Sequence, residues 1–191
     1  MNWCTFLIIT WASHFSWVAV SWAVDPSLLA ELQFNVSQDT MSNSTTTAGQ
    51  SSIYLGGVYL RMHPKTKVYL GAEALSGTSI VKVDTTTQAK ATSQDVLLGM
   101  RYNFGKHEIF SVAAMYGVAA KVSYDLLSAT SVEKWSGTSY MLRFGVTPNL
   151  KGNLSVLINL NYYSATYLKE TSGDVVSRTA LFPTVGMSLE Y

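Results

Sequence analysis

The sequence has few charged residues, and those it has nearly cancel. Asp, Glu, Lys and Arg make up only 13% of its 191 residues, with 13 basic and 12 acidic side chains. That share is about half of what is usual in soluble proteins. Because there is no basic excess, the composition argues against a nucleic-acid-binding protein.

Groups that carry metal or redox chemistry are also scarce. The chain has one cysteine, Cys4, and three histidines. It contains no Cys–His cluster of the kind that binds zinc and no glycine-rich phosphate loop. No apolar run beyond the N-terminus is long enough for a convincing membrane helix. We therefore predict no metal, no cofactor and no catalytic residues.

Residues 1–23 are predicted to be a secretory signal peptide. Phe6–Ile9 and Trp17–Val20 supply an apolar core, and the small residues Ser21 and Ala23 precede a cleavage point before Val24. The segment lacks a basic residue near its start, so a retained membrane anchor is the alternative. Cleavage would remove the only cysteine and leave residues 24–191 as a single domain.

From residue 28 onward, apolar residues recur at every second position. This period is typical of strands, whose successive side chains point to opposite faces. It predicts about eight strands, near 28–37, 54–62, 68–75, 96–104, 110–118, 139–146, 154–162 and 183–191. The fifth can extend through Val122 and Tyr124. Short turns at 63–66, 105–108 and 148–153 alternate with long polar segments at about 38–52, 76–94, 125–137 and 169–178. An even number of strands joined in this way predicts an antiparallel up-and-down β-barrel.

The distribution of charge between the two strand faces separates a soluble barrel from a membrane barrel. One face is apolar and uncharged, and its members include Leu32, Phe34, Val58, Leu60, Leu70, Leu98, Met100, Val112, Tyr116, Leu142, Phe144, Val156, Ile158, Val185 and Leu189. The other face holds many glycines and the mid-strand charges, with Lys121 further along. A charge in the middle of a bilayer costs about 2–4 kcal/mol for Arg or Lys, so the uncharged face is predicted to meet lipid.

The last stretch, Leu181–Tyr191, alternates apolar with small or polar residues and ends on an aromatic residue. At this point the chain resembles bacterial outer-membrane β-barrels of the OmpA transmembrane-domain and OmpX-like kind. The resemblance implies location in the outer membrane, contact with its lipids and lipopolysaccharide, and recognition of the last strand by the barrel-assembly machinery. It also implies a monomer with short turns toward the periplasm and long loops outside.

Five charged side chains on the inward face are predicted to form an ion-pair network in the lumen: Glu31, Glu73, Arg101, Arg143 and Glu190. Charges in a narrow lumen should pair, because a buried unpaired charge is costly. The function that fits best is a non-enzymatic structural or surface-exposed protein with long extracellular loops. Two alternatives stay open: a small gated, porin-like pore closed by the network, and a lipid-modifying enzyme. The enzyme would need a reactive set near the outer rim, where the sequence offers only Lys121, Ser123 and Tyr124.

Overall fold

The computed structural model describes residues 27–42, 47–63, 65–82, 88–126 and 132–191. The predicted signal peptide, residues 1–23, lies outside the described residues. No helix within the described part of the chain is long and apolar enough to cross a membrane.

Nearly all described residues belong to antiparallel strands. The strands are β1 (Leu28–Ser42), β2 (Thr47–Arg61), β3 (Val68–Lys82), β4 (Gln88–Phe104), β5 (Phe110–Leu126), β6 (Val132–Val146), β7 (Asn149–Lys151), β8 (Leu154–Lys169) and β9 (Val175–Glu190). A 3-10 turn, η1 (Lys106–Glu108), connects β4 to β5. Gly105, which precedes it, has φ of 83°, a left-handed conformation that glycine adopts without strain.

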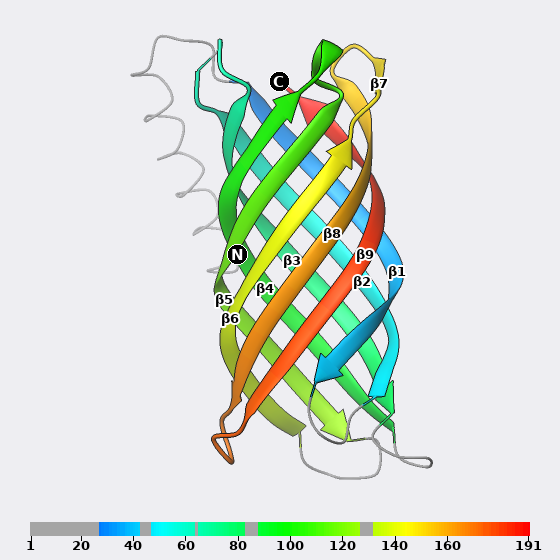
Figure 1. Ribbon diagram of the computed structural model, residues 1–191, viewed down its shortest axis with the longest axis vertical. Coiled ribbons are helices and arrows are strands. Elements are labelled where there is room, and N and C mark those ends of the chain that lie inside the picture. Colours follow the sequence, from blue (N-terminus) through cyan, green and yellow to red (C-terminus); the bar gives the residue numbers. More distant parts are fainter. Residues whose placement is uncertain (1–26, 43–46, 64, 83–87, 127–131) are drawn as a thin grey trace, which may run out of the picture.

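The eight long strands close into a ring, as predicted. Each pairs with its neighbours in sequence, β6 pairs with β8, and β1 pairs with β9 to complete the barrel, while the three-residue β7 only lines the turn before β8. The C-terminus, η1 and β7 lie at one end, the top of Figure 1. We call this the short-turn end. Leu28 and Tyr191 exchange two backbone hydrogen bonds there, which joins the first and last strands.

The prediction of four long polar loops is wrong. The strands run through most of those segments and leave only residues 43–46, 83–87, 127–131 and 170–174 to connect them at the opposite end. We call this the loop end. Ser, Thr and small residues in these stretches keep the ladder hydrogen bonds of the strand, although their side chains give no apolar alternation to reveal it. Strands of 15–17 residues therefore extend beyond the about 9–11 residues that cross a bilayer.

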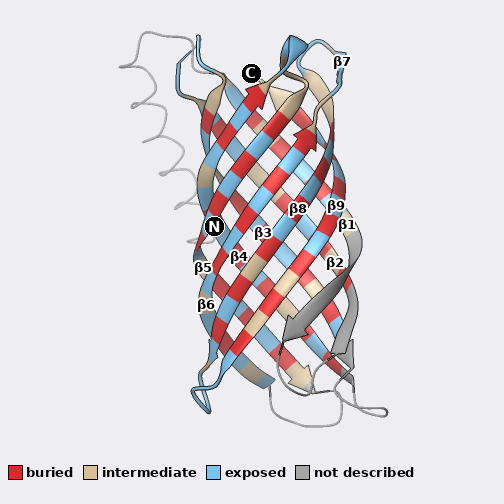
Figure 2. Ribbon diagram, in the orientation of Figure 1, coloured by how far each residue is buried: buried red, intermediate tan, exposed pale blue. Residues whose placement is uncertain are grey.

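The predicted division between inward and outward faces is confirmed through the middle of the barrel. Buried and exposed residues alternate along the eight long strands where Figure 2 colours them. Leu98 is 47% exposed, whereas its neighbour Leu97 is 0% exposed. Large apolar side chains thus cover the outside, and the charged face lines the lumen.

A β-bulge in β5 overturns one part of this assignment. Leu97 pairs with Gly117 and Val96 with Ala119, so Val118 is an extra residue in the ladder. One inserted residue exchanges the two faces of everything beyond it. Val122 and Tyr124, predicted to point outward, are buried in the lumen, while Lys121 and Ser123 are exposed on the outside. The set Lys121, Ser123 and Tyr124 is therefore divided between two faces.

Candidate functional site

The short-turn half of the lumen holds four charged side chains that the sequence singled out. Glu31 on β1, Glu73 on β3, Arg101 on β4 and Arg143 on β6 all point inward and are at most 5% exposed. Each comes from a different strand, where it occupies an inward-facing position at a similar depth in the barrel. The structure brings these four residues together.

Two ion pairs connect them. Arg143 binds Glu73 through both guanidinium nitrogens, Nη1 to Oε1 at 2.5 Å and Nη2 to Oε2 at 2.7 Å. Arg101 pairs with Glu31. A longer contact of 3.6 Å from Arg143 to Glu31 joins the two pairs. A two-bonded guanidinium–carboxylate contact gives strong, direction-specific binding, so Glu73 is the preferred partner of Arg143.

Neutral side chains complete the coordination of the charges. The hydroxyl of Tyr59 donates to Glu73, and Nε of Arg143 donates to Asn161 at 2.7 Å. Nε of Arg101 donates to Asn103 at 2.8 Å. Gln33 donates to Glu31 at 3.1 Å. Gln33 in turn accepts hydrogen bonds from Asn159 and Thr184. These bonds offset part of the desolvation cost of burying the charges.

Two glycines make room for this arrangement. A Cβ atom on Gly57 would lie 2.6 Å from Cγ of Glu73, and one on Gly71 would lie 2.7 Å from Cε1 of Tyr59. Gly71 thus lets the Tyr59 ring lie flat across β3, where its hydroxyl reaches Glu73. The predicted preference for small inward residues has a specific role at these positions.

Glu190, the fifth predicted member, lies apart from the other four. It is at the short-turn mouth, where its carboxylate is 3.9 Å from Arg61 and accepts a hydrogen bond from Tyr69 at 3.3 Å. Arg61 also binds Glu108 through both carboxylate oxygens, at 2.9 and 3.1 Å. Arg61 and Glu108 were missed in the sequence because both stand at the edge of a predicted turn.

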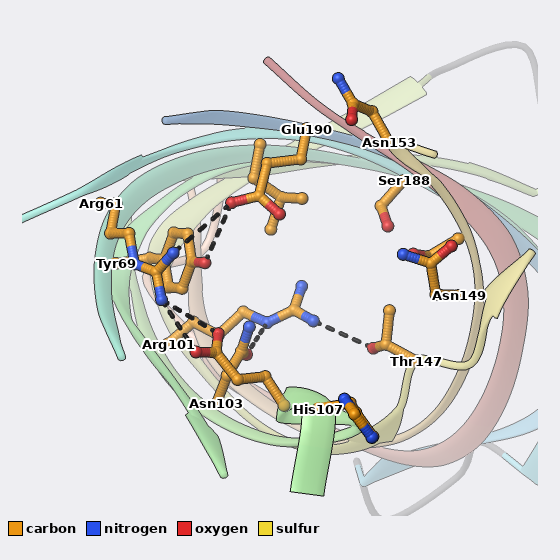
Figure 3. Close-up of a pocket in the computed structure, with 13 residues that line it drawn as sticks. Arg61, Tyr69, Arg101, Asn103, His107, Thr147, Asn149, Asn153, Ser188 and Glu190 are labelled. Atoms are coloured by element: carbon orange, nitrogen blue, oxygen red, sulfur yellow. Dashed lines mark hydrogen bonds and ion pairs between the residues drawn. The ribbon is translucent and has the colours of Figure 1, made fainter. Parts of the chain in front are cut away.

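A cavity of about 390 Å³ opens at this mouth. Figure 3 shows Arg61, Tyr69 and Glu190 on one side of it and Thr147 and Asn149 on the other. Arg101 lies between them and donates to Thr147 at 3.1 Å. The cavity therefore reaches the ion pairs of the lumen from the short-turn side.

Beyond the ion pairs lies an apolar layer across the lumen. Its side chains are 0–2% exposed and come from β2, β3, β4, β6 and β9: Ile53, Leu55, Leu75, Leu97, Met141 and Phe182. Along β4, Leu97 stands between Arg101 and the next inward charge. None of these six residues lines the cavity at the mouth. The layer separates the polar short-turn half from the lumen beyond.

A second polar cluster fills the lumen on the far side of this layer. Tyr163 donates to Asp95 at 2.5 Å and shares a hydrogen bond with Tyr167 at 2.8 Å. Arg178 donates to Ser93 at 2.7 Å and Ser79 at 3.1 Å, and its guanidinium lies 5.6 Å from the centre of the Tyr163 ring. Asp95 and Arg178 are each 2% exposed.

This cluster was missed because the predicted loop at 169–178 included Arg178, and Asp95 fell between the predicted loop at 76–94 and the predicted strand at 96–104. A signal existed. Counting backward in steps of two from Leu97 reaches Asp95 and Ser93, and counting backward from Phe182 reaches Arg178. The inward phase continues without interruption along both strands.

The histidines outside the predicted signal peptide, His63 and His107, are exposed at the short-turn end. No group of three or more His, Cys, Asp or Glu side chains in the described ranges could hold a metal ion.

An antiparallel ring of eight strands, apolar outside and filled by polar layers inside, defines a β-barrel of the transmembrane type. Neither a protein-family model nor a curated protein sequence matches the chain.

Solved structures show a likeness in fold. Neisserial surface protein A superposes with a TM-score of 0.53 at 14% identity, over 87% of this chain and 97% of that one. Ail, the attachment invasion locus protein of Yersinia pestis, superposes with a TM-score of 0.50 at 10% identity, over 87% and 98%. The chain has the fold of these small outer-membrane β-barrel proteins.

Proposed function

We propose that this chain is a non-enzymatic, monomeric outer-membrane β-barrel protein whose lumen is closed, and that it acts as a structural component of the membrane and its surface. The observation that carries the proposal is that polar and apolar side chains are distributed in the opposite way to those of a soluble barrel. Paired charges and hydrogen-bonded amides lie inside, and a continuous apolar surface lies outside.

The outer surface supports a lipid environment. Its large apolar side chains are 40–68% exposed in the barrel, among them Leu32, Phe34, Val58, Leu70, Leu98, Met100, Leu142, Phe144 and Ile158. A band of this extent is far larger than the apolar patches that soluble monomers tolerate. Lipid hydrocarbon chains can cover this apolar band without exposing it to water.

Aromatic residues support the position of one membrane boundary. On the outside near the short-turn end, Tyr102, Phe104, Phe110 and Phe144 form a chain of stacked rings with centroid distances of 6.1, 5.6 and 6.4 Å. Aromatic girdles of this kind lie at the edges of the hydrocarbon region. Short turns face the periplasm in such barrels, so we orient the short-turn end inward, with the last strand available to the assembly machinery during insertion.

The interior supports a closed barrel. Eight-stranded barrels have a lumen that side chains fill, and here an apolar layer separates two polar clusters. The proposal predicts outer-membrane fractionation and a gel mobility that differs between boiled and unboiled samples. It also predicts no conductance in planar bilayers. Fractionation with soluble proteins and a mobility that ignores boiling would contradict it.

One observation favours a small gated pore as a second candidate. The cavity at the mouth reaches Arg101, so only the ion pairs and the apolar layer separate it from the rest of the lumen. A pore that these pairs close would show conductance steps that increase in Glu73→Gln or Arg143→Gln. A silent wild type together with silent variants would leave the closed structural barrel as the function.

A further inference from the structure

Two cavities adjoin at the short-turn end of the barrel. The cavity at the mouth, of about 390 Å³, has a neighbour of about 320 Å³ that extends to Ser27 and the last residue, Tyr191. Four residues line both cavities: Asn149, Asn153, Ser155 and Glu190. The two cavities therefore form one groove, which runs from the lumen over the turn between β7 and β8 to the outer rim. We call it the rim groove.

The turn between the two cavities is held in place by its own hydrogen bonds. Asn149 pairs with Ser155 across the short ladder of β7 and β8, and Gly152 closes the turn with φ of 60°. The Asn149 carboxamide donates to the Gly152 carbonyl at 3.0 Å, and the Glu190 amide donates to the Asn153 carbonyl at 3.0 Å. The backbone that carries the groove residues is therefore ordered before a ligand binds, which lowers the entropic cost of binding.

One wall of the rim groove has hydrogen-bonding groups that no other described residue uses. The side chains of Asn153, Ser155 and Ser188 make no hydrogen bond within the described part of the chain, and the Asn149 carboxamide oxygen accepts none there. Figure 3 shows no dashed line at Asn149, Asn153 or Ser188, whereas the charged residues across the cavity are joined to partners. Ser188 is 2% exposed and lines the mouth cavity. Because a buried hydroxyl group is costly without a partner, Ser188 favours a polar ligand in the groove.

The charged wall of the groove favours an uncharged ligand. Arg61 already binds Glu108 at 2.9 Å, and Arg101 already pairs with Glu31, so both guanidinium groups are engaged by carboxylates. An anion would meet the carboxylates of Glu108 and Glu190, and a cation would meet the two guanidinium groups. A neutral ligand avoids both repulsions and can bind to the amides and hydroxyls of the other wall.

We infer that the rim groove binds the end of a neutral glycan whose sugars carry N-acetyl groups. Sugar hydroxyls donate and accept hydrogen bonds, as the hydroxyls of Ser155 and Ser188 do. An acetamido group presents the same N–H and C=O pair as the carboxamides of Asn149 and Asn153. This rests on the proposed function only for the side of the membrane, since the orientation places the short-turn end in the periplasm.

The shape of the groove favours a chain end over the middle of a chain. The apolar layer closes the lumen beyond the mouth, so only the terminal sugar can enter, and the following sugars lie over the turn toward the Tyr191 ring, which is 71% exposed. An extended peptide is the other chain with regular N–H and C=O groups, but peptides of this kind bind by pairing with an open strand edge. The edge strand beside the groove, β7, has only three residues. A glycan therefore fits the groove better than a peptide.

The test is isothermal titration calorimetry of the detergent-folded protein with chitotriose, a short chain of N-acetylglucosamine. Maltotriose, which has hydroxyl groups and no N-acetyl group, and the uncharged peptide N-acetyl-tetra-alanine amide are the comparison ligands. The site variant is Asn153→Ala with Ser155→Ala. The control is Gln94→Ala with Ser136→Ala, which removes a carboxamide and a hydroxyl that are exposed outside the barrel toward the loop end.

The wild type should bind chitotriose in preference to both comparison ligands. A neutral hydrogen bond contributes about fivefold in affinity, so the site variant should bind chitotriose about 25-fold more weakly. The single variant Ser188→Ala should bind about fivefold more weakly, and it supplies the same test if the double variant fails to fold. The control should bind like the wild type.

Equal binding by the wild type and the folded site variants, or an equal loss in the control, would overturn the inference. Equal binding of maltotriose would overturn the preference for N-acetyl groups, and stronger binding of the peptide would replace the glycan as the ligand. Gel mobility of boiled and unboiled samples is recorded for every variant. A folded wild type that does not bind chitotriose refutes the site alone, whereas a wild type without heat-modifiable mobility refutes the proposed barrel itself.

Discussion

Replacing Glu73 by glutamine tests the geometry of the lumen network. The Glu73 side chain is 1% exposed and holds Arg143 through two contacts of 2.5 and 2.7 Å. Glu73→Gln leaves a buried guanidinium whose remaining carboxylate neighbour, Glu31, is 3.6 Å away. Removing one partner of a buried pair costs about 3–5 kcal/mol, and the nearby Glu31 places the expected loss at the lower end.

A double-mutant cycle separates this pair from its neighbours. Glu73→Gln combined with Arg143→Gln should show a coupling energy near the top of the usual range of about 0.5–3 kcal/mol. The cycle of Glu73 with Arg101 should show a distinctly smaller coupling, because Arg101 pairs with Glu31 instead. A full cycle for Glu31 with Arg101 serves as the matched control and should again be large.

The assay is equilibrium urea unfolding from lipid vesicles. Once residues 1–23 are removed, Trp135 is the only tryptophan left in the chain, so its fluorescence reports on a single buried site. Coupling indistinguishable from zero for Glu73 with Arg143 would refute the network. Equal coupling of Glu73 to both arginines would refute the specific pairing.

The outward face, the packing of the lumen and the N-terminus can each be tested separately. Leu98→Arg should destabilise the folded protein in vesicles by about 2–4 kcal/mol, while Leu150→Arg in the short turn should cost about 0–1 kcal/mol; equal costs would contradict the outward assignment. Gly71→Ala should displace the Tyr59 ring and cost about 1–3 kcal/mol in urea unfolding, and a neutral substitution would show that the ring has space to move. Intact mass of membrane-extracted protein should give a mature chain that begins near Val24, and a species that retains Met1–Ala23 would indicate an anchor helix instead.

The parts of this fold that the sequence predicts are those where the physical contrast between the two faces is strong. Hydrocarbon excludes charge, so the period-two pattern alone assigns Leu98 to the outer face and Arg101 to the lumen. The outer halves of the strands lack this contrast, since Ser and Thr suit either face, and there the strands were read as loops. For the same reason, the polar cluster of Asp95 and Arg178 was not predicted.

Two other features cannot be predicted from the sequence pattern of a single strand. The bulge at Val118 leaves no trace in the alternation of β5, yet it moves Lys121 out of the lumen and Tyr124 into it. The choice of Arg143 over Arg101 as the partner of Glu73 depends on how strands across the barrel are positioned relative to one another. The preference of each residue for a face is local, but its partner is set by the closure of the whole ring.

The most direct test of the central claim is the collision accessibility of a spin label attached to Leu142→Cys in lipid vesicles. Leu142 is 51% exposed on the outside of β6, in the middle of the apolar surface. We predict that the label collides freely with oxygen dissolved in the hydrocarbon and is shielded from a water-soluble nickel chelate. Greater accessibility to the chelate than to oxygen would mean that this face meets water, and would contradict a membrane-spanning barrel.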